Sequence, residues 1–189
     1  MWTIIKKEVK SYFLSPIAYI FIGLFLFMNS IFFYLDVYAI GRVNFEYMFG
    51  SLATVLTFVV PILTMRMFAE ERKNGTEQIL YTSPRSITSI VLGKFLAATI
   101  IMVICEVFTL MYLGILKYFG QPHISTALVT LLGFLLLSMA YIAFGMFASS
   151  ITENQIIAGV ITIAGLLVIW LMPSFYSSLS NFSLINVFS

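Results

Sequence analysis

The chain has 189 residues, of which 61% are hydrophobic and only 10% are charged. Soluble domains are about half apolar and about a quarter charged, so this composition excludes an ordinary soluble domain and indicates an integral membrane protein. The net charge of +2 does not suggest a nucleic-acid partner, and a single cysteine (Cys105) and a single histidine (His123) argue against a metal site.

Residues 2–13 form the first predicted element, an amphipathic helix. Apolar side chains such as Ile5, Val9 and Tyr12 recur at helical spacing, whereas the lysines lie mostly elsewhere. This pattern favours a helix in the membrane interface, and the alternative is a plain extension of the first span. Ser15-Pro16 follows as a turn, because a residue before proline avoids helical geometry.

Five apolar runs are long enough to cross a membrane, which takes roughly 17 to 25 residues. Each must be a helix, since lipid offers no partners for backbone groups, and continuous apolar runs exclude a barrel. The sequence therefore predicts an all-α, polytopic membrane protein with one transmembrane domain over residues 1–189. The predicted spans are residues 17–35, 48–65, 95–116, 124–151 and 156–172.

The basic residues predict the orientation of these spans. Only Arg42 and Lys117 fall on one side of the membrane. Because basic residues collect in cytoplasmic segments, the N-terminus and the 66–94 loop are expected in the cytoplasm, and residues 173–189 at the outer face. The basic residues on the other side are Lys6, Lys7, Lys10, Arg66, Arg72, Lys73, Arg85 and Lys94.

The 66–94 loop contains the signals of a short helix. Asn74-Gly75 breaks the helix that leaves the second span, and Thr76 can cap a new one with Glu77 in its first turn. Ser83-Pro84 ends it after about two turns. Such a helix is either a connector that packs on its own bundle or a docking element for a cytoplasmic partner, and the residues alone leave both readings open.

Glu106 is the one charged residue within the third predicted span. A carboxylate in hydrocarbon costs about 2.5 kcal/mol or more on insertion scales. It is therefore either part of a substrate or proton path, a hydrogen-bonding group between subunits, or a neutral carboxyl bonded within the bundle.

The pattern E-E-R-x-x-G-T-x-x-x-[IL]-L-x-x-[ST]-P-x-S, running here from Glu70 to Ser86 and followed by Leu92-Gly93-Lys94, resembles the permease subunits of type-2 ABC exporters. Small bacterial permeases associated with gliding motility are especially similar. The resemblance implies location in the bacterial cell membrane and six spans, one more than the sequence shows.

The resemblance also implies a coupling helix at residues 75–83, seated in a separate ABC ATPase subunit that binds ATP and Mg²⁺. A second permease copy or a paralogue would complete the transporter. The chain has no G-x-x-x-x-G-K-[ST] phosphate loop, so it is expected to be a transport subunit with no cofactor of its own rather than an enzyme. The alternative is a membrane assembly or anchoring protein that docks a cytoplasmic partner without transport. The implied coupling residues are Glu70, Glu71, Arg72, Gly75, Thr76, Glu77, Gln78, Ile79, Leu80, Tyr81, Ser83 and Pro84.

Overall fold

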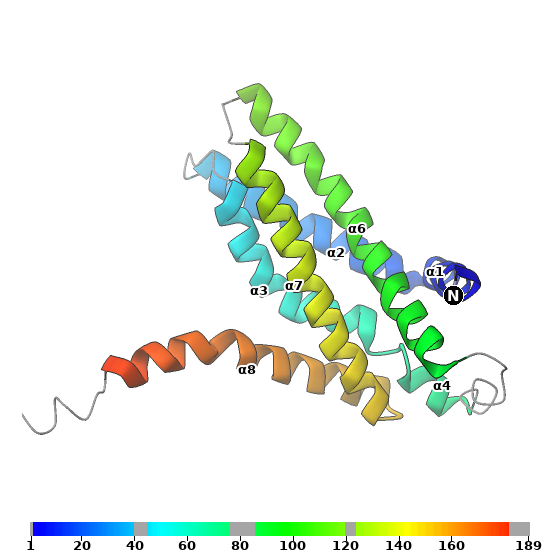
Figure 1. Cartoon of the computed structure of the whole chain (residues 1–189). Coiled ribbons are helices and arrows are strands. Elements are labelled where there is room, and N and C mark those ends of the chain that lie inside the picture. The colour runs from blue at the N-terminus through cyan, green and yellow to red at the C-terminus, as the bar shows by residue number, and fades with distance from the viewer. Residues whose placement is uncertain (1, 40–44, 76–85, 120–123, 182–189) are drawn as a thin grey trace, which may run out of the picture.

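Five long apolar helical segments dominate the computed structural model, which describes residues 2–39, 45–75, 86–119 and 124–181 (Figure 1). Within these ranges every regular element is helical, and five segments are long and apolar enough to cross a membrane. The predicted all-α class and the five spans are confirmed. The segments are Pro16–Asp36, Met48–Lys73, Ile87–Tyr118, Ile124–Ile151 and Gln155–Pro173.

The N-terminal part of the chain consists of α1 (Trp2–Leu14) and α2 (Pro16–Phe33), which continues into the π-helical η1 (Tyr34–Ala39). Ser15 between α1 and α2 is extended, with φ −99° and ψ 154°, and Pro16 opens α2. The predicted turn is therefore confirmed, because the extended residue before proline separates two helices. Whether α1 lies in the membrane interface stays a prediction.

The 66–94 loop predicted from the sequence is wrong in its extent. Within the second segment, α3 (Phe45–Thr64) ends, a turn follows, and α4 (Ala69–Lys73) forms a separate short helix. The third span, α6 (Ile87–Phe119), begins eight residues before the predicted position 95. The carbonyl of Ser86 accepts hydrogen bonds from the N–H groups of Ser89 and Ile90, at 3.0 and 3.4 Å, so a helix starts directly after this serine.

The last two spans are α7 (Ile124–Ile151) and α8 (Gln155–Asn181). We expected the fifth span to end at residue 172 with a separate outer-face segment from 173, but α8 continues through Pro173 to Asn181. A proline inside a helix removes one backbone hydrogen bond and favours a kink there, and Pro173 is exposed. The helix itself runs away from the bundle in this part (Figure 1).

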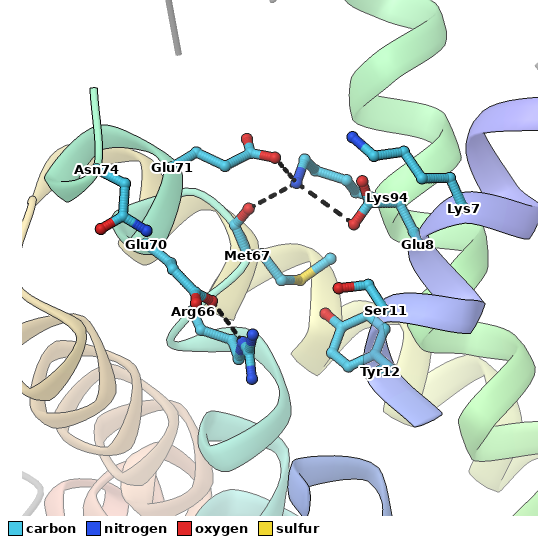
Figure 2. Close-up of a pocket in the computed structure, with 10 residues that line it drawn as sticks. All are labelled: Lys7, Glu8, Ser11, Tyr12, Arg66, Met67, Glu70, Glu71, Asn74 and Lys94. Atoms are coloured by element: carbon cyan, nitrogen blue, oxygen red, sulfur yellow. Dashed lines mark hydrogen bonds and ion pairs between the residues drawn. The ribbon is translucent and has the colours of Figure 1, made fainter. Parts of the chain in front are cut away.

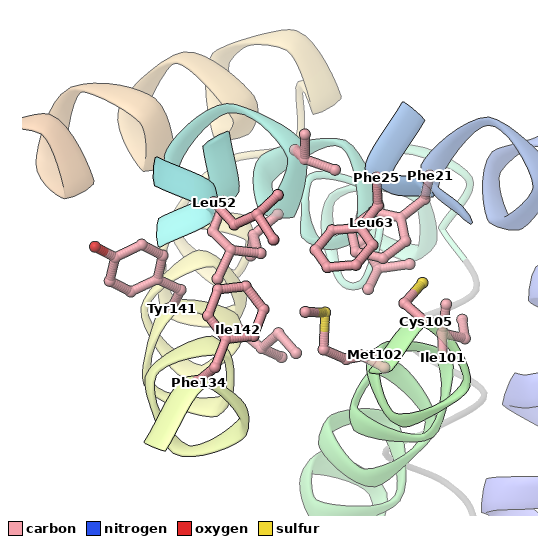
Figure 3. Packing of buried hydrophobic residues seen from close by; sticks show 14 of the residues in the cluster. Phe21, Phe25, Leu52, Leu63, Ile101, Met102, Cys105, Phe134, Tyr141 and Ile142 are labelled. Carbon is pink, nitrogen blue, oxygen red and sulfur yellow. The ribbon is translucent and has the colours of Figure 1, made fainter. Parts of the chain in front are cut away.

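The buried core lies between α2, α3, α6 and α7, and aromatic rings fill much of it (Figure 3). The ring of Phe134 on α7 packs edge-on against Phe49 of α3, with centroids 4.8 Å apart, and lies 6.1 Å from the ring of Phe25 on α2. Such offset arrangements suit the charge distribution of aromatic rings. The core therefore joins the first two spans to the fourth.

Gly145 of α7 allows three helices to approach one another. A Cβ atom at this position would lie 2.8 Å from Cβ of Thr64 on α3 and 3.1 Å from Cγ2 of Thr162 on α8. Small residues at helix contacts are the usual way in which membrane helices pack closely. Thr64 is the last residue of α3, so this crossing fixes where α3 stops relative to α7.

We predict that Gly145→Ala lowers the free energy of unfolding by about 1–3 kcal/mol, because the added methyl group overpacks the crossing. Gly133→Ala on the same helix is the matched control, since a Cβ atom there would have nothing within 4 Å. Thermal unfolding in detergent measures both variants. Equal midpoints for the two alanine variants would contradict the close crossing.

Candidate functional site

The most elaborate polar structure in the described part of the chain surrounds the turn Met65–Phe68, where α3 ends and α4 begins. A helix break leaves backbone N–H and C=O groups without their intrahelical partners. At the edge of a membrane these groups require partners from elsewhere in the protein. Side chains from α1, α6 and α7 supply them, as the following contacts show.

Ser149 near the end of α7 bonds to the turn three times. Its Oγ accepts hydrogen bonds from the N–H groups of Phe68 and Ala69, both at 3.1 Å, and donates to the carbonyl of Met65 at 3.2 Å. A hydroxyl has one donor and two acceptor sites, so this side chain is fully used. These three bonds tie the end of α7 to the α3–α4 turn.

Tyr12 of α1 reaches the end of α3 from another side. Its buried Oη donates to the carbonyl of Leu63 at 3.3 Å. Burial raises the pKa of Tyr12 well above its ordinary value of 10.0, and the charge of Glu8 adds to this effect. The phenol therefore keeps its proton at neutral pH and remains a donor.

Lys94 of α6 links three segments through one buried ammonium group, and only 3% of its side chain is exposed (Figure 2). Its Nζ donates to the carbonyl of Met67 at 2.8 Å and to Oε1 of Glu71 at 2.7 Å. Oε2 of Glu8 on α1 lies 3.6 Å away, and the ring of Phe68 faces the ammonium at 5.3 Å from its centroid. A lysine has three donors, and here three oxygen atoms from three segments surround them.

A polar pocket of about 180 Å³ opens beside Lys94, between α1 and the α3–α4 turn (Figure 2). Its acidic and basic side chains balance, and Arg66 pairs with Glu70 one helical turn away at 2.6 Å. Such a partly exposed ion pair adds little stability, so its main effect is to hold the two side chains in place. The lining residues are Lys7, Glu8, Ser11, Tyr12, Arg66, Met67, Glu70, Glu71, Asn74 and Lys94.

The structure places four of the predicted coupling residues beside this pocket or directly after it. Glu70 and Glu71 lie in the first turn of α4 and Arg72 in its last. Gly75 follows with a φ of +68°, a conformation that favours glycine and ends the helix, as the Asn74-Gly75 signal predicted. The remaining predicted residues, Thr76, Glu77, Gln78, Ile79, Leu80, Tyr81, Ser83 and Pro84, lie outside the described residues.

Glu106 does not belong to this site. It lies in the middle of α6, whereas Lys94 lies near the start of that helix. Its Oε1 is buried and has no hydrogen-bond partner among the described residues, so the bonded carboxyl that we considered from the sequence is not observed at this atom.

Sequence reasoning missed the residues that hold the site together, namely Glu8, Tyr12 and Lys94. Lys94 was predicted to lie at the end of the 66–94 loop, and its contacts with α1 and α4 were not predicted. One signal was present: Gly93-Lys94 interrupts an otherwise apolar helical pattern. A Cβ atom at Gly93 would lie 3.2 Å from Cβ of Ile4, so this glycine brings α1 against α6 and Glu8 within reach of Lys94.

The fold and the site define a multi-pass membrane protein in which side chains from α1, α6 and α7 bond to the α3–α4 turn. The family described as ABC-2 family transporter protein matches residues 34–189. The chain therefore belongs to this family and is a permease subunit of an ABC transporter. No curated protein and no solved structure matches the chain.

The family match covers everything from η1 onward, and α1 and α2 precede it. It confirms the resemblance to type-2 ABC permeases that the Glu70–Ser86 pattern indicated. The narrower resemblance to gliding-motility permeases stays a prediction, and so does the cytoplasmic position of the N-terminus.

We predict that Lys94→Met lowers the free energy of unfolding of the permease by about 2 kcal/mol. Breaking a buried ion pair costs 3–5 kcal/mol, and the partial exposure of Glu8 and Glu71 reduces that figure. Methionine keeps an unbranched stem of the same length and lacks only the terminal ammonium group, so the loss reports on the ammonium. Lys73→Met, at an exposed residue, is the matched control and should change stability by less than about 0.5 kcal/mol.

A double-mutant cycle with Glu71→Gln isolates the contact with Lys94. Chemical unfolding of the two single variants and the double variant should give a coupling energy of about 1 kcal/mol, because the residues share one hydrogen bond. Strictly additive effects would show that Lys94 and Glu71 do not interact in the membrane.

Proposed function

We propose that this permease works as an exporter, driven by a separate ABC ATPase that seats the 75–83 segment as a coupling helix. The observation that carries this proposal is the contact between Lys94 and Glu71, since these residues flank that segment on both sides. Glu71 lies in α4 before it, and Lys94 lies in α6 after it. The family membership supports the presence of an ATPase partner.

The hydrogen bonds that hold the α3–α4 turn support transmission of force from the 75–83 segment to the spans. A displacement of residues between Gly75 and Ser86 acts on α4 and on the first turns of α6. Lys94 joins these two helices to each other and to α1, and Ser149 joins the turn to α7. Linked hydrogen bonds of this kind move together, so the spans would respond as a unit.

In the proposed transporter the ATPase binds ATP and Mg²⁺, and two ATPase copies act on a pair of permeases. The second permease is another copy of this chain or a paralogue. The excess of basic residues on one side supports placing the N-terminus and the coupling segment in the cytoplasm of a bacterial cell.

We predict that purification of the tagged permease recovers an ABC-class ATPase at two copies per permease pair. Leu80→Ala and Glu77→Ala should each lower the recovered ATPase about tenfold while membrane insertion stays normal. Truncating a central interface residue commonly costs 1–2 kcal/mol, which corresponds to that factor. Quantitative mass spectrometry of the purified complex measures the ratio.

Leu136→Ala is the matched control for Leu80, because Leu136 is exposed on α7 in the middle of a span and should leave the ratio unchanged. Recovery of a cytoplasmic protein without ATPase activity would favour the assembly or anchoring function instead. Full ATPase recovery in both loop variants would show that the coupling segment has been placed wrongly.

A further inference from the structure

An apolar groove of about 350 Å³ lies between α6 and α7, on the outer surface of the bundle. Apart from Glu106, every residue that lines it is a leucine or a valine. Val107 of α6 and Leu132 of α7 flank its mouth and are 57% and 62% exposed. The groove is therefore open to hydrophobic molecules dissolved in the membrane.

Packing alone does not explain the presence of Glu106 in this apolar groove. The residue is only 8% exposed, and its Oε1 has no partner among the described residues. A buried oxygen without a donor costs roughly 1–3 kcal/mol. Protonation would not remove this cost, because the proton sits on one oxygen and leaves the other as an acceptor.

The position of Glu106 along α6 places it near the middle of the membrane. It is twelve residues from Lys94 and eleven from Lys117, which at 1.5 Å per residue is about 18 Å and about 17 Å. Half of the hydrocarbon layer measures about 15 Å. The headgroup of a bilayer phospholipid therefore does not reach this carboxyl.

We propose that this groove binds a medium-chain primary amine, with its nitrogen at the Glu106 carboxyl and its chain along the leucines and valines. An amine supplies the missing N–H donor. The lining residues that the structure describes include no basic side chain, so the ligand also supplies the opposite charge. The net charge of the pair is zero whether a neutral amine meets a carboxylic acid or an ammonium meets a carboxylate. The occupied groove is therefore neutral in either form.

The size of the groove restricts the ligand to a single chain. The lining residues of α6 run from Val103 to Leu110 and those of α7 from Leu128 to Leu135. Seven residue steps correspond to about 11 Å, the length of one medium alkyl chain rather than of a two-chain lipid. As an assignment of transported substrate, this inference rests on the proposed function, whereas binding itself does not.

The test uses a decylamine that carries a photoreactive diazirine on its chain, and the matched decanol probe. The full chain in phosphatidylcholine nanodiscs is irradiated with each probe without ATP, and labelled peptides are identified by mass spectrometry. The amine should label residues 103–110 or 128–135 about tenfold more than the alcohol. Glu106→Gln should reduce amine labelling to the level of the alcohol.

Three further variants separate binding from folding. Val107→Phe should block the groove from its lipid side, and Val160→Phe on α8 is the control, because both valines are similarly exposed at 57% and 59%. Glu153→Gln, in the turn between α7 and α8, controls for the Glu106 substitution.

Three results would overturn the proposal: equal labelling by amine and alcohol, unchanged labelling of Glu106→Gln, or protection of the groove by a second copy of the chain. Competition by phosphatidylethanolamine would also overturn it, since a lipid headgroup would then reach the carboxyl. Because no ATPase takes part, loss of labelling would leave the proposed transport function untouched, and failure to recover an ATPase would leave the binding result standing.

Discussion

The helix break between α3 and α4 constrains the rest of the structure, because its backbone groups must all find partners at the edge of an apolar bundle. Side chains from three different helices donate hydrogen bonds to these groups, namely Ser149, Tyr12 and Lys94. None of these helices can shift alone without leaving a carbonyl or an N–H group unpaired, at roughly 1–3 kcal/mol for each. The packing of α1, α6 and α7 around this end of the bundle follows from that requirement.

The same requirement makes this end of the bundle suited to receiving force. A continuous helix from α3 into the loop would pass motion only along its own axis. A break bonded sideways to α1, α6 and α7 distributes a displacement among them, and Lys94 adds a charged contact that resists separation of α4 from α6. In the proposed transporter, this arrangement would pass the motion of the separate ATPase to the spans, and membership of the ABC-2 family supports that proposal.

Apolar run lengths were enough to predict the class and the five spans, because lipid imposes one backbone solution on every long apolar segment. Local signals also predicted the Ser15-Pro16 turn and the end of α4 at Asn74-Gly75, since each depends on a residue's own backbone preference. The role of Lys94 could not be predicted in this way. It depends on Glu8, which is 86 positions away in sequence and reaches the ammonium only because Gly93 lets α1 approach α6.

Polar groups on α6 divide into two kinds, and the difference is informative. Thr109 accepts a hydrogen bond from Nδ2 of Asn29 at 2.6 Å and donates to the carbonyl of Cys105, and Lys94 is surrounded by acceptors. Thr109 and Lys94 are therefore satisfied within the protein and stabilise its packing. Glu106 lies on the same helix and lines an open apolar groove, yet its buried Oε1 has no hydrogen-bond partner among the described residues. A group that only stabilised the bundle would gain more from a partner inside the protein, so its position at the groove favours a ligand that arrives from the membrane.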